Sequence, residues 1–313
     1  MTARIAPTSL LNFTAVLFAA VAAPALAATP LVTAPQGGVA RWDGLKAKDC
    51  GIYGKRYGAV AGSCYYPVDI RAKPGRYQIA LWDQDGRQHL GALVVDDAHF
   101  PEVEMQLPEK LARYLDVSAE DRARAAEERA AVRKVLSGTL DAPRFTLPLH
   151  KPAASLPRSE DDFGSLRTFN GKHKSLHSGR DYPVGDGNSV SAVADGRVVL
   201  AADHFFTGNA VYVDHGGGLV SMNFHLKSIS VKAGDEVKRG QTLGKVGATG
   251  RATGPHLHMG LRWLGKRIDP ALLLEAPAKL PSVSDSHNEA EQKIRDAEQK
   301  EPDEVDSTLD EEG

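Results

Sequence analysis

The sequence has few cysteines and few aromatic residues. Of its 313 residues two are cysteine, and 6% are Phe, Trp or Tyr. Neither cysteine has a Cys-x-x-Cys partner or a neighbouring histidine in sequence, which argues against a reactive thiol. The small aromatic content does not favour a base-stacking surface or a carbohydrate platform, and we expect no nucleic-acid partner. The ordinary apolar content of 42% predicts a globular chain with one large domain or two medium ones.

A long hydrophobic run is also missing. The apolar stretch from Phe13 to Ala23 is too short to cross a hydrocarbon core of about 30 Å. Arg4 precedes this stretch and Ala25-Leu26-Ala27 follows it, which is the pattern of a cleaved secretory signal. We therefore expect residues 1–27 to be a signal peptide. The mature chain would be exported to the periplasm or secreted, without stable insertion in a membrane.

The two cysteines both follow this signal. In an oxidising compartment, Cys50 and Cys64 would most simply pair with each other. On the chain-entropy account, a disulfide that closes so short a loop stabilises the fold by roughly 3 kcal/mol.

The net charge is small but unevenly distributed. It is -2 for the whole chain, yet residues 285–313 hold 12 acidic and three basic residues. Residues 28–284 are mildly basic, with 34 basic and 28 acidic residues. Such an excess suits an anionic polymer such as a cell wall, although it is also common on surfaces without that partner. The acidic end is poor in apolar residues, which predicts a disordered tail over residues 277–313.

The chain after the signal divides into three folded regions by composition. Residues 28–107 contain alternating stretches and Asp-Gly and Pro-Gly turns, which predict a small β-sandwich-like domain for binding or spacing. Residues 108–160 are predicted to form a helical connector, capped at Ser118, and then a proline-rich extended linker. Residues 161–276 contain short strand candidates separated by glycine turns, which predict an all-β domain.

Histidines of this last domain form a pattern suited to a metal. His177 and Asp181 make an H-x-x-x-D element, His256 and His258 make an H-x-H element, and His225 lies between them in sequence. In a strand, His256 and His258 would face the same side. Two histidines and one carboxylate are a catalytic zinc ligand set that leaves a fourth position open. Each element alone occurs by chance in many chains, so the indication comes from the whole set.

Several stretches resemble the lysostaphin-type (LytM-like) zinc endopeptidases of bacterial cell walls. The resemblance covers about residues 163–274, with the motifs in the family's order. More loosely, the upstream regions and Arg167–Gly171 resemble the multidomain Gram-negative branch of that family. The matching stretches are His177–Tyr182, Gly208–Gly216, Phe224–Leu226, Val231–Val237, Gly240-Gln241, Val246–Gly250 and Gly254–His258.

The resemblance implies a β-sheet groove with one zinc ion per chain. By the family's pattern, the zinc ligands are His177, Asp181 and His258. His225 and His256 are then the catalytic histidines, and the sequence does not divide the acid and base roles between them. Arg167 and Asn170 either line the groove or form a structural turn. The implied activity is hydrolysis of peptide cross-links in peptidoglycan for cell-wall remodelling, with the D-Ala–diaminopimelate bond as the first expectation and a polyglycine bridge still open.

Other functions are compatible with parts of the sequence. Residues 231–246 also resemble half of a lipoyl- or biotinyl-carrier barrel, but the lysine that such a carrier presents at a hairpin tip is missing. A non-catalytic wall-binding regulator that activates an amidase is the main alternative. It would lack metal ligands, whereas this chain keeps all five residues. One position departs from the family: Asn223 stands where a tyrosine is often found. The sequence leaves the oligomeric state open.

Overall fold

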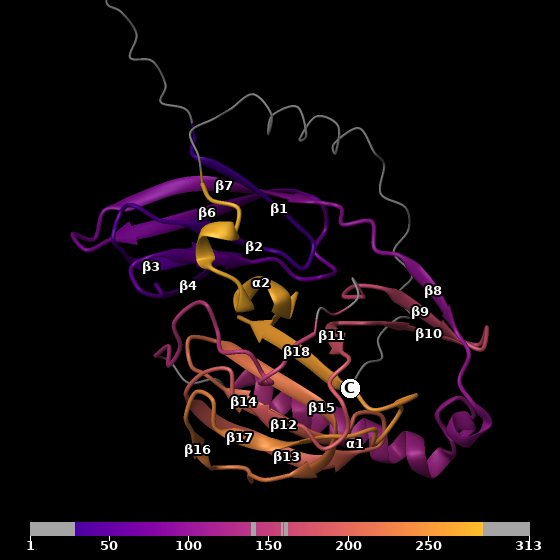
Figure 1. Cartoon of the computed structure of the whole chain (residues 1–313). Coiled ribbons are helices and arrows are strands. Elements are labelled where there is room, and N and C mark those ends of the chain that lie inside the picture. Colours follow the sequence, from indigo (N-terminus) through magenta and orange to yellow (C-terminus); the bar gives the residue numbers. More distant parts are fainter. Residues whose placement is uncertain (1–28, 139–141, 158, 160–161, 284–313) are drawn as a thin grey trace, which may run out of the picture.

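The structure, a computed structural model, describes residues 29–138, 142–157, 159 and 162–283. The predicted signal peptide and the predicted tail from residue 284 onward lie outside the described residues. Figure 1 shows two β-rich parts, a smaller one formed by the strands up to β7 and a larger one that contains β11 to β18. Within the described ranges, no helix is long and apolar enough to span a membrane.

The N-terminal part is a two-layer β structure. Its larger sheet has the order β1-β7-β6-β3-β4, and β2 and β5 form a separate two-stranded sheet. The two layers pack together, because Trp42 of β2 and Tyr66 of β5 share a buried cluster with Ile79 and Leu81 of β6. The predicted β-sandwich-like domain is therefore confirmed. Its strands are β1 (Leu31–Pro35), β2 (Val39–Trp42), β3 (Ala47–Ile52), β4 (Lys55–Gly58), β5 (Cys64–Pro67), β6 (Gly75–Asp83) and β7 (Gln88–Asp96).

A disulfide joins the two layers of this part. It links Cys50 of β3 to Cys64 of β5, and both residues are fully buried. The crosslink therefore connects the larger sheet to the smaller one inside a single hydrophobic core.

A nine-stranded sheet forms the C-terminal part, as predicted for an all-β domain. Val211 of β14 and Leu257 of β18 belong to a core on one face, whereas Tyr212 and Met222 face the other side. Apart from the short helix α2 (Pro270–Leu274), the sheet supplies the framework. Its strands are β11 (Gly179–Tyr182), β12 (Ser189–Ser191), β13 (Gly196–His204), β14 (Gly208–Asp214), β15 (Leu219–Ile229), β16 (Glu236–Val237), β17 (Thr242–Val246), β18 (Leu257–Trp263) and β19 (Lys266–Ile268).

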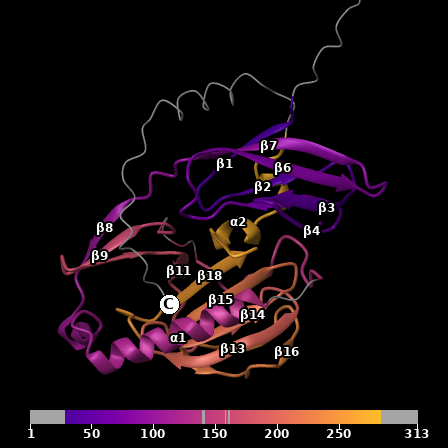
Figure 2. The same cartoon turned by 180° about the vertical axis from the view of Figure 1, so that it is seen from behind.

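The predicted helical connector is α1 (Ala119–Ser137). The Ser118 hydroxyl caps it by accepting a hydrogen bond from the backbone N–H of Asp121 at 3.0 Å. Ala125 and Val132 are buried, and Val132 packs against the sheet face that carries Tyr212. Figures 1 and 2 both show α1 lying across β13, β14 and β15. The helix therefore covers part of one sheet face.

The proline-rich segment 142–157 is extended, as predicted, but it does not act as a free linker. Phe145 and Leu149 are buried in the core of the C-terminal part. The segment also lies tightly against the turn at Gly216, where the backbone φ is 72° and a Cβ atom would be 1.8 Å from the carbonyl oxygen of Ala142. Two apolar side chains and a glycine contact therefore hold the segment to the large sheet.

The strand that precedes the predicted domain boundary at residue 107 pairs with a strand from the C-terminal half of the chain. β8 (Glu102–Met105) does not join the N-terminal sheets; it pairs in parallel with β9 (Leu166–Phe169). β9 in turn pairs antiparallel with β10 (His173–Leu176). These three strands form a small sheet of their own. A parallel pairing between segments so far apart in sequence leaves no local signal.

The folded body extends beyond the predicted start of the tail at residue 277. The 3-10 turn η2 (Pro277–Lys279) continues the chain, and Leu280 is buried in the core of the C-terminal part. The backbone N–H of Arg41 then donates to the carbonyl of Pro281 at 2.9 Å, and Val283 donates to the carbonyl of Arg41 at 3.0 Å. Leu280 is the apolar residue that attaches this segment to the core. The acidic composition of the segment as a whole gave no sign of it.

The two β-rich parts are docked against each other. Arg267 of β19 donates from its backbone N–H and its guanidinium to the carboxylate of Asp69, at 2.9 and 2.8 Å. The ring of Tyr65 in β5 lies 5.5 Å from that of Trp263 in β18. The N-terminal part is thus fixed to the large sheet by both polar and apolar contacts.

Candidate metal site

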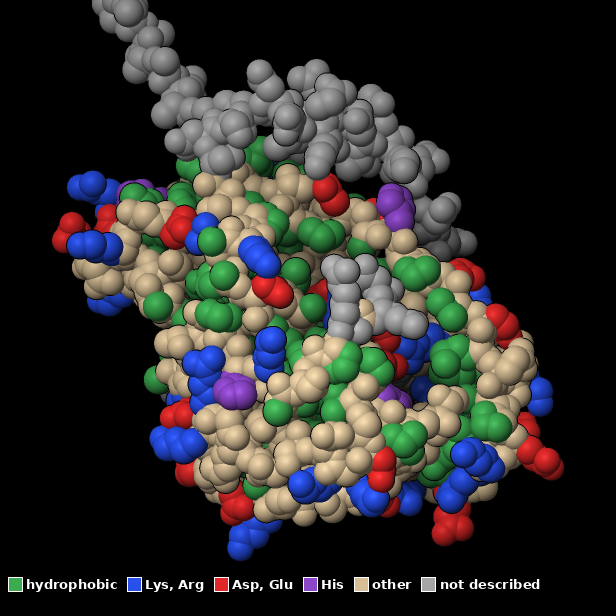
Figure 3. All heavy atoms as spheres, in the orientation of Figure 1, with side chains coloured by type: hydrophobic (Ala, Val, Ile, Leu, Met, Phe, Trp, Pro, Cys, Tyr) green, Lys and Arg blue, Asp and Glu red, His purple; other side chains and the backbone are tan. Residues whose placement is uncertain are grey.

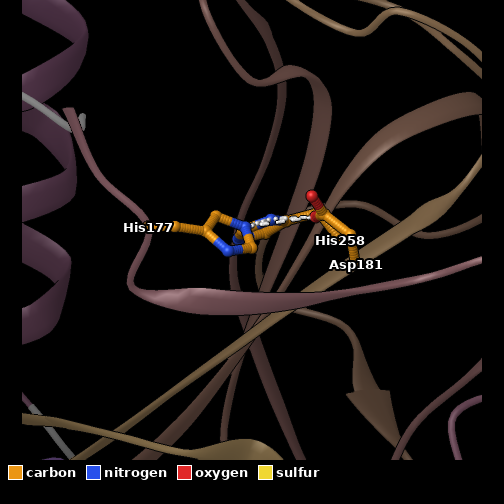
Figure 4. A group of neighbouring side chains, drawn as sticks. All are labelled: His177, Asp181 and His258. Atoms are coloured by element: carbon orange, nitrogen blue, oxygen red, sulfur yellow. Dashed lines mark hydrogen bonds and ion pairs between the residues drawn. The ribbon is translucent and has the colours of Figure 1, made fainter. Parts of the chain in front are cut away.

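Three side chains meet where β11 and β18 lie side by side (Figure 4). Asp181 of β11 stands directly opposite His258 of β18 in the antiparallel register, so both project from the same face. His177 reaches the same point from the loop between β10 and β11. One possible ligand atom from each residue lies within 4.8 Å of the others. The structure thus brings together the three residues predicted as metal ligands.

The donor atoms of these three residues converge. His177 Nε2 lies 3.2 Å from Asp181 Oδ1 and 3.1 Å from His258 Nδ1. His258 Nδ1 lies 2.8 Å from Asp181 Oδ1. On its other side, His177 Nδ1 lies 3.1 Å from the carbonyl oxygen of Asp162. The same Nδ1 lies 3.0 Å from Arg167 Nη2, so a carbonyl oxygen and a guanidinium both face it, while Nε2 faces the other two possible ligands.

Gly179 makes room for the third ligand. A Cβ atom at this position would lie 2.4 Å from His258 Nε2 and 2.6 Å from the carbonyl oxygen of Met259. Both distances are shorter than carbon contacts allow. The close approach of β11 to the His258 ring therefore requires a residue without a side chain.

Arg167 of β9 reaches the site from the small sheet. Its Nη2 donates to Asp181 Oδ2 at 3.0 Å and to Asp162 Oδ2 at 2.9 Å. Of the two predicted readings, a groove residue or a turn residue, its placement fits the first. Asn170 has the other role: its φ is 49°, and its Oδ1 accepts a hydrogen bond from the backbone of Leu107 at 2.7 Å. Asn170 holds a turn and does not line the pocket.

The two histidines predicted as catalytic flank the three donors. His225 Nδ1 lies 2.8 Å from the carbonyl oxygen of Thr249, and His256 Nδ1 lies 2.8 Å from that of Gly254. Because both acceptors are carbonyls, each Nδ1 carries the hydrogen and each neutral ring presents an unprotonated Nε2. The two ring centroids are 4.9 Å apart. His256 Nε2 lies 3.5 Å from Asp181 Oδ1.

Burial and neighbouring side chains shift the pKa values of His225 and Asp181. Burial, and then the neighbouring His256 and His258, lower the pKa of His225 to about 3, so its ring is neutral near neutral pH. For Asp181, burial raises the pKa, but hydrogen bonds from His177 and His258 outweigh it and hold the pKa well below its usual value. The site therefore offers an ionised carboxylate at Asp181 and a neutral imidazole at His225. His225 also has a φ of 60°, an uncommon conformation for a residue other than glycine.

The site opens into a pocket of about 340 Å³. Its floor is the sheet face with Phe224, whose ring stacks on that of His258 at 5.0 Å. Its walls include α1 and the 3-10 turn η1 (Glu109–Tyr114). In Figure 3 the surface is hollowed to the right of centre, where basic and histidine side chains are visible. Among the described lining residues Asp181 is the one acid, while six are basic: Arg122, Arg129, Arg167, Lys174, Arg251 and Arg262.

Several pocket residues carry no motif signal in the sequence. Arg251 lies in a loop and Arg262 in a strand, each without a recognisable motif, and Arg129 lies in helix α1. Only the pairing of the strands and the packing of α1 place them together. Asn223, the position that departs from the family, is fully buried and does not line the pocket.

The donor set fits a divalent metal ion. Two imidazole nitrogens and one carboxylate oxygen converge, and the remaining side faces a pocket with two further histidines. Three protein ligands with an open fourth position are typical of a catalytic rather than a structural zinc site. Fold and site together therefore define a protein of the mononuclear metallohydrolase class.

Comparison with known proteins identifies the family. The model of peptidase family M23 matches residues 175–270. A solved structure of a candidate M23 peptidase from Pseudomonas aeruginosa is 32% identical, with a TM-score of 0.58, and the match covers 76% of this chain and 94% of that one. The chain belongs to peptidase family M23, of which the lysostaphin-type enzymes are the members that its motifs resemble.

Curated relatives match over the C-terminal part. The peptidoglycan DD-endopeptidase ShyA of Vibrio cholerae is 40% identical over 98 residues, which are 31% of this chain and 23% of that protein. The DD-carboxypeptidase/endopeptidase Mpg of Neisseria meningitidis is 40% identical over 95 residues, which are 30% of this chain and 22% of that protein. The chain thus spans less than a quarter of the length of these relatives.

Proposed function

We propose that this chain is a zinc-dependent endopeptidase that hydrolyses peptide cross-links of bacterial peptidoglycan, with the D-Ala–diaminopimelate bond as its first target. The observation that carries the proposal is the convergence of His177, Asp181 and His258 beside His225 and His256 in one pocket. The relatives named as DD-endopeptidases support the substrate. A non-catalytic regulator is not favoured, because all five residues are present and meet.

His177, Asp181 and His258 would hold one Zn²⁺ ion per chain. Bound zinc acts as a Lewis acid and brings the pKa of a coordinated water down to about 7. The Asp162 carbonyl and Arg167 Nη2, which both lie beside His177 Nδ1, orient that ligand ring. Arg167 fixes the second carboxylate oxygen of Asp181 in the same way.

His225 and His256 act on the protons of the reaction. In its neutral form each ring presents an unprotonated Nε2 that can accept a proton from the attacking water. Once protonated, the same Nε2 can donate a hydrogen bond to the oxyanion or a proton to the leaving amine. The geometry gives both rings the same hydrogen-bond pattern, so we assign the acid and base roles to the pair.

Digestion of purified peptidoglycan tests the proposal. Residues 28–313 are incubated with it, and the products are identified by mass, in parallel with chelator, with zinc restored, and with His256→Ala. Cross-linked dimers should fall to monomers only when zinc and His256 are both present. The matched control is His99→Ala, since the side chain of His99 is exposed and lies outside the pocket. Dimers that persist although zinc binds stoichiometrically would contradict the proposal.

We also propose that the mature chain works outside the cytoplasm, in the periplasm, after loss of residues 1–27. The support is the sequence pattern of the N-terminus and the disulfide between Cys50 and Cys64, since such bonds persist in oxidising compartments. Fractionation of cells followed by N-terminal sequencing would place the mature start at Ala28. A chain that keeps Met1 in the cytoplasm would contradict this.

A further inference from the structure

A second polar group lies in the same pocket, away from the metal site. His258, Gly260 and Arg262 alternate along β18 and therefore share one face of the sheet. Four residues of a strand advance by about 13 Å. Arg262 lines the pocket, as His258 does. The pocket therefore continues from the metal site along β18 to a guanidinium group.

Arg262 is a cation without a counter-ion among the described residues. Its Nε is buried and has no hydrogen-bond partner there. Asp69 attracts the charge, but its carboxylate is already bound by Arg267 at 2.8 Å. Burial, and then the positive charge of Arg267, lower the pKa of Arg262, although an arginine stays protonated at physiological pH. An unpaired cation in this position is unfavourable unless a ligand uses it.

Tyr212 supplies a second unused donor at the same place. It is 1% exposed, and its hydroxyl has no hydrogen-bond partner in the described part of the chain. The register Tyr212–Met222–Gly260 across β14, β15 and β18 sets Tyr212 on the face that carries Arg262. Tyr212 also lines the pocket. Arg262 and Tyr212, whose side chains are both able to donate, therefore line the same pocket.

We propose that Arg262 and Tyr212 bind a carboxylate of the substrate peptide, three to four residues from the bond that is cut. This inference rests on the proposed function for the identity of the substrate. A carboxylate accepts from both groups at once and is the natural partner of a planar guanidinium. An extended peptide advances about 3.3 Å per residue, so one that starts at the metal site reaches Arg262 after three to four residues. The excess of basic residues in the pocket attracts the same anionic ligand.

Two matched ligands test this subsite. One is a cross-linked peptide dimer of the diaminopimelate type with free carboxylates, and the other is the same dimer with those carboxylates converted to amides. Calorimetry with chelator-treated protein gives Kd for each, and digestion with zinc-loaded protein gives kcat/KM. Arg262→Met should weaken binding of the free acid by about tenfold to a hundredfold and leave the amide unchanged. Tyr212→Phe should weaken it less, and Arg262→Lys should restore part of the loss.

The control is Arg122→Met. It also removes a positive charge from the pocket lining, but from an exposed side chain that donates to the carbonyl of Val117. Equal losses in Arg122→Met and Arg262→Met, or a wild-type chain without preference for the free acid, would overturn the subsite. Cleavage that ignores Arg262 would overturn it while leaving the proposed function in place. If the protein prefers the free acid through Arg262 but cleaves neither ligand, the subsite is supported and the proposed function is contradicted.

Discussion

At the scale of single residues, the site depends on a missing side chain as well as on its ligands. His258 can stand opposite Asp181 because Gly179 leaves open the space that the imidazole occupies. The five chemically active residues could be predicted from the sequence, since they fall in short motifs. Arg262 and Tyr212 could not, because an arginine and a tyrosine in strands carry no pattern until the register brings them together.

Replacing Gly179 with alanine should lower the affinity for zinc by about tenfold or more, because the new Cβ forces the His258 ring out of place. Competition with a chromogenic chelator measures the affinity. Gly58→Ala is the control, since nothing lies within 4 Å of a Cβ built at Gly58. Equal zinc affinities for Gly179→Ala and the wild type would show that the ring can move aside.

At the scale of elements, local sequence patterns predicted several helices and strands but not how these elements pack together. The capped helix and the short strands were predictable, because capping residues, alternation and glycine turns are local. The packing of segment 142–157 was not, since Phe145 and Leu149 show no periodicity. The pairing of β8 with β9 depends on contacts between distant segments, and it is this small sheet that delivers Arg167 to the site.

The turn between β14 and β15 should make stability depend on pH. His215 is fully buried, with Nδ1 2.9 Å from the carbonyl of Asp195 and Nε2 2.8 Å from Ser221 Oγ. Burial lowers its pKa to about 4. The unfolded chain takes up this proton below its ordinary pKa of about 6.5 and the folded chain does not. The contribution is therefore complete above pH 6.5 and falls towards pH 4, by up to about 1.4 kcal/mol per pH unit.

Urea unfolding of the wild type and of His215→Gln at several pH values checks this. The difference between the two free energies of unfolding should shrink as the pH falls from 7 to 4, since only the wild type carries the buried histidine. His99→Gln, at an exposed position, should show a pH dependence like that of the wild type. A constant difference between wild type and His215→Gln would contradict the assignment.

At the scale of the whole molecule, polar contacts and shared apolar packing hold the two β-rich parts together. Asp69 of the N-terminal part accepts from both the backbone and the side chain of Arg267, and burial leaves this ion pair little solvent. Nearby, the rings of Tyr65 and Trp263 pack together. The ion pair therefore fixes the orientation while the rings add apolar area.

A double-mutant cycle on Asp69→Ala and Arg267→Ala should reveal an energetic coupling between these two residues. Each single variant should lose about 1.5–3 kcal/mol of stability, because the partner is left without its charged hydrogen bonds. The double variant should lose less than the sum of the two. The exposed pair Lys279–Glu275 is the control and should show coupling below about 1 kcal/mol. Purely additive losses for Asp69 and Arg267 would mean that the two residues do not act together.

Residues 281–283 form backbone hydrogen bonds with Arg41, so the last described residues are attached to the N-terminal part. If the chain were nicked once, between β7 and β8, the first fragment would keep Arg41, Asp69 and Tyr65, and the second would keep their partners. The disulfide lies within the first fragment and would not hold the pieces together. The molecule would nevertheless persist as a reconstituted two-piece protein, with an elution volume on gel filtration like that of the intact chain.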